Sequence, residues 1–425
     1  MSSLNYKFII KVILYSIVLC IIIVSPIDFL SNYVIALLTL CVSFLLMIKS
    51  RKNIVVFVLF MFIFYINYSV IFGEYIIKGN VSVPFYEVKN ILNYGIGIKT
   101  LFIFSLTLLV FYKPSHLSNT TLIKGNENIL IFICLWVFLM FIGVFSIDRT
   151  MTQSYEVKIT PAYEYSKLIF LLLAYYSGSN RILKTLVVVT SIFFIAQDFY
   201  YGGRITSIQL LMMLGLIFGS KVLTVKRIIL ASLSGLFLSN LVNQYRTTYS
   251  FSNINFVEMI DNFKKSYFVF DTATYAYYAS ATHIAASFRV NKYEELSSFF
   301  QFSKGIIFLG SNDSGELSSY VSNNFYFNLG GGIITSHFYF WFGWIGVIFI
   351  SLFLIYLINL FNKKKINNEY FMILNVLLVS NVSRWYLYSP NQLFKGTLLM
   401  GGAIILFIIF ANKLSKKEQK VDKKI

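Results

Sequence analysis

The chain has 425 residues, of which 57% are hydrophobic, 18% aromatic and only 13% charged. Soluble domains carry about 25% charged residues, so this composition excludes an ordinary soluble protein. The apolar residues come in runs of about 20, the length that a helix needs to cross a bilayer core. The net charge is +18, from 36 Lys and Arg against 18 Asp and Glu, and its meaning depends on where these charges lie.

Twelve apolar runs predict membrane-spanning helices, because backbone groups inside lipid must be hydrogen-bonded internally. In chain order they cover approximately residues 8–25, 29–48, 54–72, 93–112, 128–147, 164–178, 183–201, 205–220, 228–243, 337–361, 369–388 and 394–411. The first run follows Lys7 and has no small-residue cleavage site. We therefore expect a retained membrane helix and not a cleaved signal peptide.

The distribution of Lys and Arg predicts that both termini are cytoplasmic. With the N-terminus inside, the predicted cytoplasmic segments hold 20 basic residues, whereas the short outer loops hold six. Those six are Lys78, Lys89, Arg149, Lys158, Arg204 and Arg384. Because basic loops stay on the cytoplasmic side, the +18 charge indicates orientation and not binding to nucleic acid.

The expected fold class is an all-α polytopic membrane protein with about twelve transmembrane helices and one large outer loop. Residues 1–243 would hold the first nine helices, 244–332 the loop, 333–412 the last three helices, and 413–425 a basic cytoplasmic tail. The loop contains amphipathic stretches, including 293–302, and such stretches beside a membrane favour helices at the interface.

Missing motifs exclude several kinds of chemistry. Cys20, Cys41 and Cys134 lie inside apolar runs without CxxC spacing, which supports neither a disulfide framework nor a zinc site. No GxxxxGK[ST] loop for ATP and no DxD pair for a metal-dependent nucleotide-sugar site occurs. We therefore expect neither a metal nor a cofactor.

Polar side chains gather at the outer ends of the predicted helices, where they are costly and usually functional. The candidates for substrate contacts are Asp198, Tyr200, Tyr201, Arg204, Tyr245, Arg246, Asp313, Glu316, His337 and Arg384. A guanidinium binds diphosphate bidentately and stays charged, so the arginines suit a lipid-linked diphosphate. His337 would take a proton from a sugar hydroxyl, because an ordinary imidazole pKa lies near 6.5.

Each candidate also has a structural interpretation. Arginines at helix ends extend to lipid headgroups, and tyrosines form an interfacial belt. His337 would otherwise donate a hydrogen bond between packed helices, and an outer acid such as Asp198, Asp313 or Glu316 would then be the base or orient an arginine. His283, in a segment of small residues, is expected to be structural.

The arrangement resembles the O-antigen (oligosaccharide repeat-unit) polymerase family, often called Wzy, and the related O-antigen ligases. The resemblance depends on the topology and on three local patterns. These patterns are Gly202-Gly203-Arg204, Gln244-Tyr245-Arg246, and Ser336-His337 followed by Gly343-Trp344-Ile345-Gly346. The spacing from His337 to Gly343 is shorter than in an ordinary ligase pattern, which favours the polymerases.

The resemblance implies inverting, metal-independent glycosyl transfer at the periplasmic face of the bacterial inner membrane. A growing glycan would leave its undecaprenyl diphosphate carrier and join a new lipid-linked repeat unit. Arg204 and Arg246 would hold the diphosphates, and His337 or a nearby acid would activate the acceptor hydroxyl. A separate protein would regulate the length of the polymer.

Two alternatives remain. A flippase or secondary transporter would fit twelve spans with both ends inside, but it should carry charged residues deep in several helices. This sequence has Lys99, Lys167 and Lys395 near the predicted boundaries. An O-antigen ligase would differ from the polymerase only in its acceptor.

Overall fold

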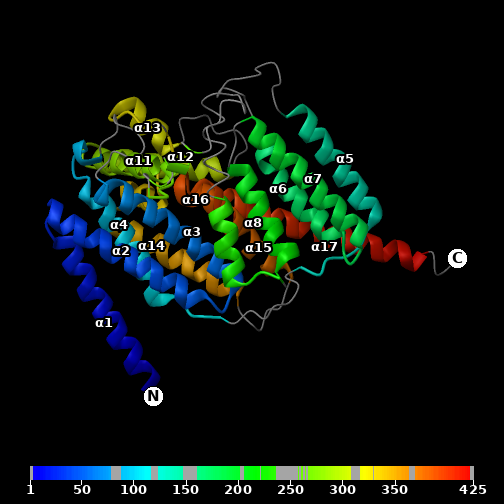
Figure 1. The fold of residues 1–425 in the computed structure, drawn as a ribbon, viewed down its shortest axis with the longest axis horizontal. Coiled ribbons are helices and arrows are strands. Elements are labelled where there is room, and N and C mark those ends of the chain that lie inside the picture. Colours follow the sequence, from blue (N-terminus) through cyan, green and yellow to red (C-terminus); the bar gives the residue numbers. More distant parts are fainter. Residues whose placement is uncertain are drawn as a thin grey trace. The chain divides into compact units, whose positions relative to one another are not determined.

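The computed structural model describes residues 3–77, 88–115, 123–146, 160–201, 205–220, 222–235, 267–307, 316–328, 330–362 and 369–421, with positions 257, 260, 261 and 264. All regular elements within these residues are helices, and none of these residues lies in a strand (Figure 1). The prediction of an all-α protein is therefore confirmed for this part of the chain.

Five helices are long and apolar enough to cross a membrane. They cover Leu30–Ser50, Ile54–Ile76, Arg181–Tyr200, Ile334–Phe361 and Gln392–Leu414. Five shorter apolar helices cover Phe8–Val24, Gly95–Phe111, Ile129–Phe145, Ile205–Gly219 and Glu369–Ser380. Together they indicate a multi-pass membrane protein. The number of twelve spans and the cytoplasmic termini stay predictions.

The chain forms two compact units that alternate along the sequence. Unit 1 comprises Met1–Ser118, Asn255–Leu360 and Val382–Asn391. Unit 2 comprises Asn119–Ile254, Phe361–Asn381 and Gln392–Ile425.

Unit 1 is built around the neighbouring helices α2, α3 and α4. Its elements are α1 (Ser3–Val24), α2 (Phe29–Ser50), α3 (Ile54–Ile71), the π-helix η1 (Phe72–Ile76), the 3-10 helix η2 (Val88–Asn90), α4 (Gly95–Phe111), α11 (Asp271–Ser287), α12 (Lys292–Ile307), α13 (Leu317–Asn324), most of α14 (Ile334–Phe361) and α16 (Val382–Leu387). Helix α2 packs against both α3 and α4. The Asp28 and Asn53 side chains cap α2 and α3 by accepting backbone N–H groups, which satisfies donors that a helix start leaves free.

A polar cluster joins four buried side chains inside unit 1. The Asn67 amide on α3 donates to Ser43 Oγ (2.8 Å) and Ser105 Oγ (3.2 Å), and the Tyr386 hydroxyl donates to Asn67 Oδ1 (2.9 Å). Polar residues that hydrogen-bond between apolar helices hold membrane bundles together. The cluster therefore ties α16 to α2, α3 and α4.

Helix α11 belongs to the predicted outer loop but packs as a core helix of unit 1. It contacts α3, α4, α13 and α16, and its alanines and its single histidine are buried. The Tyr277 hydroxyl lies 2.5 Å from that of Tyr75. Small side chains let helices approach closely, so the alanine-rich sequence of α11 explains this packing.

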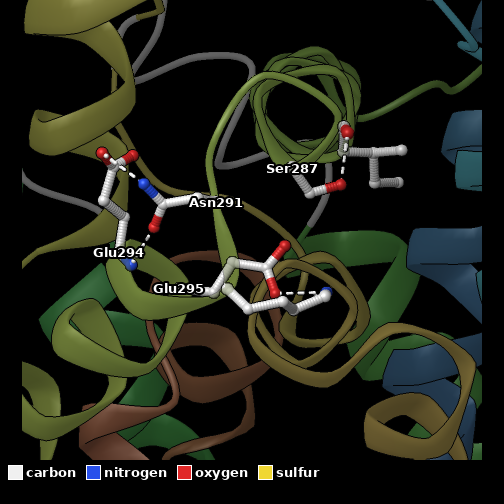
Figure 2. Close-up of polar contacts among 6 residues, drawn as sticks. Ser287, Asn291, Glu294 and Glu295 are labelled. Atoms are coloured by element: carbon white, nitrogen blue, oxygen red, sulfur yellow. Dashed lines mark hydrogen bonds and ion pairs between the residues drawn. The ribbon is translucent and has the colours of Figure 1, made fainter.

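Helix α12 begins at a reciprocal cap (Figure 2) and has apolar side chains on two sides. Asn291 Oδ1 accepts the Glu294 backbone N–H (2.9 Å), and Asn291 Nδ2 donates to Glu294 Oε1 (3.2 Å). On one side, Phe299 packs against Trp341 and Phe342 of α14, with ring centroids 5.4 and 4.9 Å apart. The other side exposes apolar residues at helical spacing. These are Tyr293, Leu296, Phe300 and Ile307.

Unit 2 contains a second group of packed helices. Its elements are α5 (Ile129–Phe145), α6 (Pro161–Tyr176), α7 (Arg181–Tyr200), α8 (Ile205–Gly219), a helix over 225–235, α15 (Glu369–Ser380), the π-helix η5 (Gln392–Leu399) and α17 (Met400–Val421). Helix α8 contacts α6, α7 and α15. The predicted span over 369–388 is interrupted at Asn381, and the span over 394–411 starts as a π-helix, a form that is frequent at functional sites.

A directional hydrogen-bond chain crosses unit 2 at this interruption. The buried Lys167 ammonium on α6 donates to Gln209 Oε1 (2.9 Å), and Gln209 Nε2 donates to Asn381 Oδ1 (3.3 Å). Asn381 Nδ2 then donates to Thr397 Oγ1 on η5 (3.0 Å). Asn381 thus links the broken helix to the π-helix.

Candidate functional site

Four of the predicted site residues lie outside the described residues. They are Arg204, Tyr245, Arg246 and Asp313. Of the others, Asp198, Tyr200 and Tyr201 belong to unit 2, whereas Glu316, His337 and Arg384 belong to unit 1.

Asp198 supports the connection between α7 and α8. Its side chain is buried, and its Oδ2 accepts both the backbone N–H (2.9 Å) and the hydroxyl (2.7 Å) of Ser207. The carboxylate therefore satisfies donors at the start of α8, where negative charge is favourable. Tyr200 and Tyr201 follow at the end of α7, with edge-to-face rings 5.2 Å apart, and the Tyr200 side chain is 56% exposed.

His337 lies in the first turn of α14 and is only 3% exposed. Its Nδ1 faces the Ile333 carbonyl oxygen at 3.4 Å. Its Nε2 makes no hydrogen bond to any residue that the structure describes. An imidazole that donates from Nδ1 keeps its lone pair on Nε2, which is the arrangement that a general base needs.

His283 of α11 lies beside His337, with ring centroids 4.8 Å apart and planes at 75°. Its Nδ1 is 3.1 Å from Ser336 Oγ and its Nε2 is 3.1 Å from Ser318 Oγ. Burial lowers the pKa of His283 well below 6.5, and the neighbouring His337 lowers it further. His283 is therefore neutral and has partners on both nitrogens.

The glycine segment 330–332 brings this histidine pair next to the segment that carries Arg384. The Gly332 N–H donates to the Leu387 carbonyl oxygen (3.0 Å). Gly332 has φ +132°, and a Cβ atom there would lie 2.5 Å from His283 Cε1 and 3.0 Å from His337 Cε1. Only glycine fits this position, because a side chain would strain the backbone and collide with both rings.

Arg384 is half-buried at the end of this segment. Its guanidinium carbon lies 5.5 Å from the centroid of the Tyr388 ring, a cation–π contact. The Arg384 carbonyl accepts the Tyr388 and Ser389 N–H groups (3.0 and 3.2 Å), which closes the turn after α16. The structure thus brings the segment carrying Arg384 to the glycines that cover His337.

The acids of unit 1 differ in position. Glu316 precedes α13 and is exposed, whereas Glu295 on α12 is 2% exposed and pairs with Lys292. The nearby Ser298 accepts the indole N–H of Trp341 (3.2 Å), which places this part of α12 against the start of α14. Glu295 is the buried acid that sequence reasoning missed, because nothing in its local sequence signals burial.

Within the described residues, no group of three His, Cys, Asp or Glu side chains could hold a metal ion. The histidine pair, its two serines and the glycine segment form the candidate site, in which the rings contact serine hydroxyls and a backbone carbonyl. Its chemistry would be proton transfer at His337 Nε2. Comparisons of the chain with protein-family models, curated proteins and solved structures found no match.

Proposed function

We propose that this chain is a membrane glycosyltransferase that polymerises lipid-linked oligosaccharide repeat units into O-antigen or capsular polysaccharide. The reaction would take place at the periplasmic face of the bacterial inner membrane. The substrates would be undecaprenyl diphosphate-linked oligosaccharides, and a chain-length regulator would be a protein partner. The proposal rests on the sequence resemblance, and the helical membrane architecture is compatible with it.

The observation that best supports the proposal is the state of His337. Its Nδ1 faces the Ile333 carbonyl and its Nε2 has no hydrogen-bond partner among the described residues. A neutral imidazole held in this way suits removal of a proton from a hydroxyl. Because His337 is only 3% exposed, the substrate hydroxyl would reach it after the glycine segment over the two rings moves.

The reaction would proceed by one displacement. His337 Nε2 takes the proton of the acceptor hydroxyl, and the hydroxyl oxygen attacks the anomeric carbon of the donor glycan. The bond between that carbon and the diphosphate oxygen breaks, and the carrier leaves as undecaprenyl diphosphate. Attack opposite the leaving group inverts the anomeric centre. Arg204 and Arg246 would stabilise the charge on the diphosphate.

Surface polysaccharide from cells carrying His337→Ala tests the proposal. We expect the polymer ladder to disappear from gels while single lipid-linked repeats still reach the periplasm. Arg204→Ala and Arg246→Ala should give the same result. Lys158→Ala, which changes a predicted outer-loop charge not assigned to the site, is the control. A ladder of normal length in the histidine or arginine variants would contradict this mechanism.

Transport of the lipid-linked oligosaccharide is the second candidate function, and one observation favours it. Lys99, Lys167 and Lys395, which were predicted near the ends of the spans, are 1%, 2% and 9% exposed within helices. Buried ionisable groups at membrane depth often mark substrate paths. Under this alternative, Lys167→Met would trap repeat units on the cytoplasmic side. Under the polymerase proposal, repeats would still cross the membrane.

A further inference from the structure

We infer that His283 is a positioning residue that fixes the tautomer of His337 through Ser336 and the Ile333 carbonyl. The catalytic consequence rests on the proposed function, but the hydrogen-bond assignment itself does not. The two rings are joined by a continuous path. His283 Nδ1 contacts Ser336 Oγ (3.1 Å), Ser336 Oγ contacts the Ile333 oxygen (2.8 Å), and the same oxygen faces His337 Nδ1 (3.4 Å).

The hydrogens around His283 do not suffice for all of its contacts. Its ring nitrogens contact Ser336 and Ser318, and these hydroxyls also contact the carbonyl oxygens of Ile333 and Gly331. These four contacts have only three hydrogens, one on the neutral ring and one on each hydroxyl. One of three acceptors must therefore go without a serine donor: the Gly331 oxygen, the Ile333 oxygen or the unprotonated ring nitrogen of His283.

The Gly331 and Ile333 oxygens differ in whether they have a donor besides the serine hydroxyl. Among the described residues, Ser318 is the donor to the Gly331 oxygen. The Ile333 oxygen also accepts the Ser336 backbone N–H (2.9 Å) and faces His337 Nδ1. Leaving a buried acceptor without a donor is unfavourable. The favoured arrangement therefore keeps the Ser318 donor on Gly331 and releases the Ser336 hydroxyl from Ile333.

This choice assigns a proton to each ring. His283 carries its proton on Nε2 and donates to Ser318, while its Nδ1 accepts the hydroxyl of Ser336. The Ile333 oxygen then has a lone pair for His337, because a carbonyl oxygen has two and Ser336 N–H uses one. His337 is held with its proton on Nδ1 and its lone pair on Nε2. Without an acceptor at position 283, the Ser336 hydroxyl would return to Ile333 and compete with His337.

Nitrogen-15 NMR of the full chain, labelled at the histidine rings, tests this assignment. The sequence has only three histidines, His116, His283 and His337, so His116→Gln and His283→Leu assign the signals. In the wild-type protein we expect a protonated Nε2 on His283 and a protonated Nδ1 on His337. A protonated Nδ1 on His283 would overturn the inference.

Two substitutions test the coupling between the rings. In His283→Leu, the Ser336 hydroxyl returns to Ile333, so His337 should become a mixture of tautomers. Adding Ser336→Ala removes this competitor and should restore the single His337 tautomer. A merely structural role of His283 predicts no such rescue. An unchanged His337 in His283→Leu, or a mixture that persists in the double variant, would contradict the coupling.

Two further single variants keep the test independent of the folding of His283→Leu. Ser336→Ala alone should leave the His337 tautomer intact while His283 loses its Nδ1 partner. Ser280→Ala is the matched control, because the Ser280 hydroxyl accepts the Ile333 backbone N–H (2.7 Å) and contacts neither ring in the structure. It should leave both tautomers unchanged. Loss of the His337 tautomer in either variant would contradict the assigned path.

Polymerisation assays separate this inference from the proposed function. His283→Leu should slow polymerisation by no more than the about 10²–10⁴-fold that a general base contributes, and Ser336→Ala should recover part of the loss. Full activity of His337→Ala with the expected NMR tautomers would reject the proposed base and keep the positioning role. Loss of activity in His337→Ala, together with a His337 tautomer that does not respond to His283→Leu, would support the proposed base and reject the positioning role.

Discussion

Ser207 of α8 donates both its backbone N–H and its hydroxyl to one oxygen of Asp198 on α7. The two contacts measure 2.9 and 2.7 Å, and both side chains are buried. In the sequence, Gly202, Gly203 and Arg204 lie between these two residues. Asp198 therefore connects the end of α7 to the start of α8, and the predicted diphosphate-binding Arg204 lies between them in the sequence.

Replacing Asp198 should cost more stability than replacing its partner. Asp198→Ala leaves the buried N–H and hydroxyl of Ser207 without this acceptor, a loss of about 1–3 kcal/mol. Ser207→Ala removes only the hydroxyl bond and should cost about 1 kcal/mol. Thermal unfolding of the purified protein in one detergent compares the two variants. Equal stabilities would show that the backbone contact contributes nothing.

Gly332→Ala should damage the histidine pair. The new Cβ would lie 2.5 and 3.0 Å from the two rings at φ +132°, so we expect loss of polymer and displaced histidine NMR signals. Gly330→Ala is the matched control, because Gly330 also has a positive φ (+85°) but no atom lies within 4 Å of its Cβ position. Gly330→Ala should lower the free energy of unfolding by only about 1–2 kcal/mol, which is the cost of a side chain at a positive φ. Identical effects of the two changes would exclude the steric argument.

Acid should destabilise the wild-type protein through His283. Burial lowers the pKa of His283 below 6.5, so the unfolded chain binds more protons at acidic pH than the folded chain does. Stability is then fully present above about pH 6.5 and falls as the pH drops below it, by at most ~1.4 kcal/mol per pH unit. Unfolding measured between about pH 5 and pH 8 should show this slope reduced in His283→Leu. The same slope in both proteins would assign the acid sensitivity to other groups.

Adjacent phenylalanines on α12 should respond differently to truncation. Phe299 packs between Trp341 and Phe342 but is half-buried, so Phe299→Ala should cost about 2 kcal/mol, less than a fully buried phenylalanine. Phe300 is 62% exposed, and Phe300→Ala should change the free energy of unfolding in micelles by less than about 0.5 kcal/mol. Unfolding in detergent measures both. A larger loss of stability in Phe300→Ala than in Phe299→Ala would show that Phe300, and not Phe299, lies on the packed side of α12.

The apolar runs predicted most helix positions well. The span expected over 54–72 is α3 (Ile54–Ile71), and that over 205–220 is α8 (Ile205–Gly219), because a long apolar run in lipid has helix as its stable form. The break at Asn381 and the π-helix over Gln392–Leu399 were not predicted. Their hydrogen bonds to residues distant in sequence, such as Gln209, leave no periodic signal.

The candidate site was predicted only in part. His337 was identified from its place at the start of an apolar run, whereas His283 was interpreted as structural. Small residues surround His283 in the sequence, but no local pattern shows which helix it approaches. That contact joins α11 to the start of α14, 53 residues apart for the His283–Ser336 pair. Only the tertiary structure brings the two rings together.

The hydrogen bond from Tyr386 to Asn67 spans 319 positions of the chain, which has a consequence for biosynthesis. Membrane helices enter the bilayer from the N-terminus onward, so Ser43, Asn67 and Ser105 meet long before Tyr386 leaves the ribosome. The amide oxygen of Asn67 therefore has no Tyr386 donor until the last part of the protein has been made. A chain that ends before Tyr386 would lack this donor to Asn67, so the polar cluster is complete only once the last part of the chain has been made.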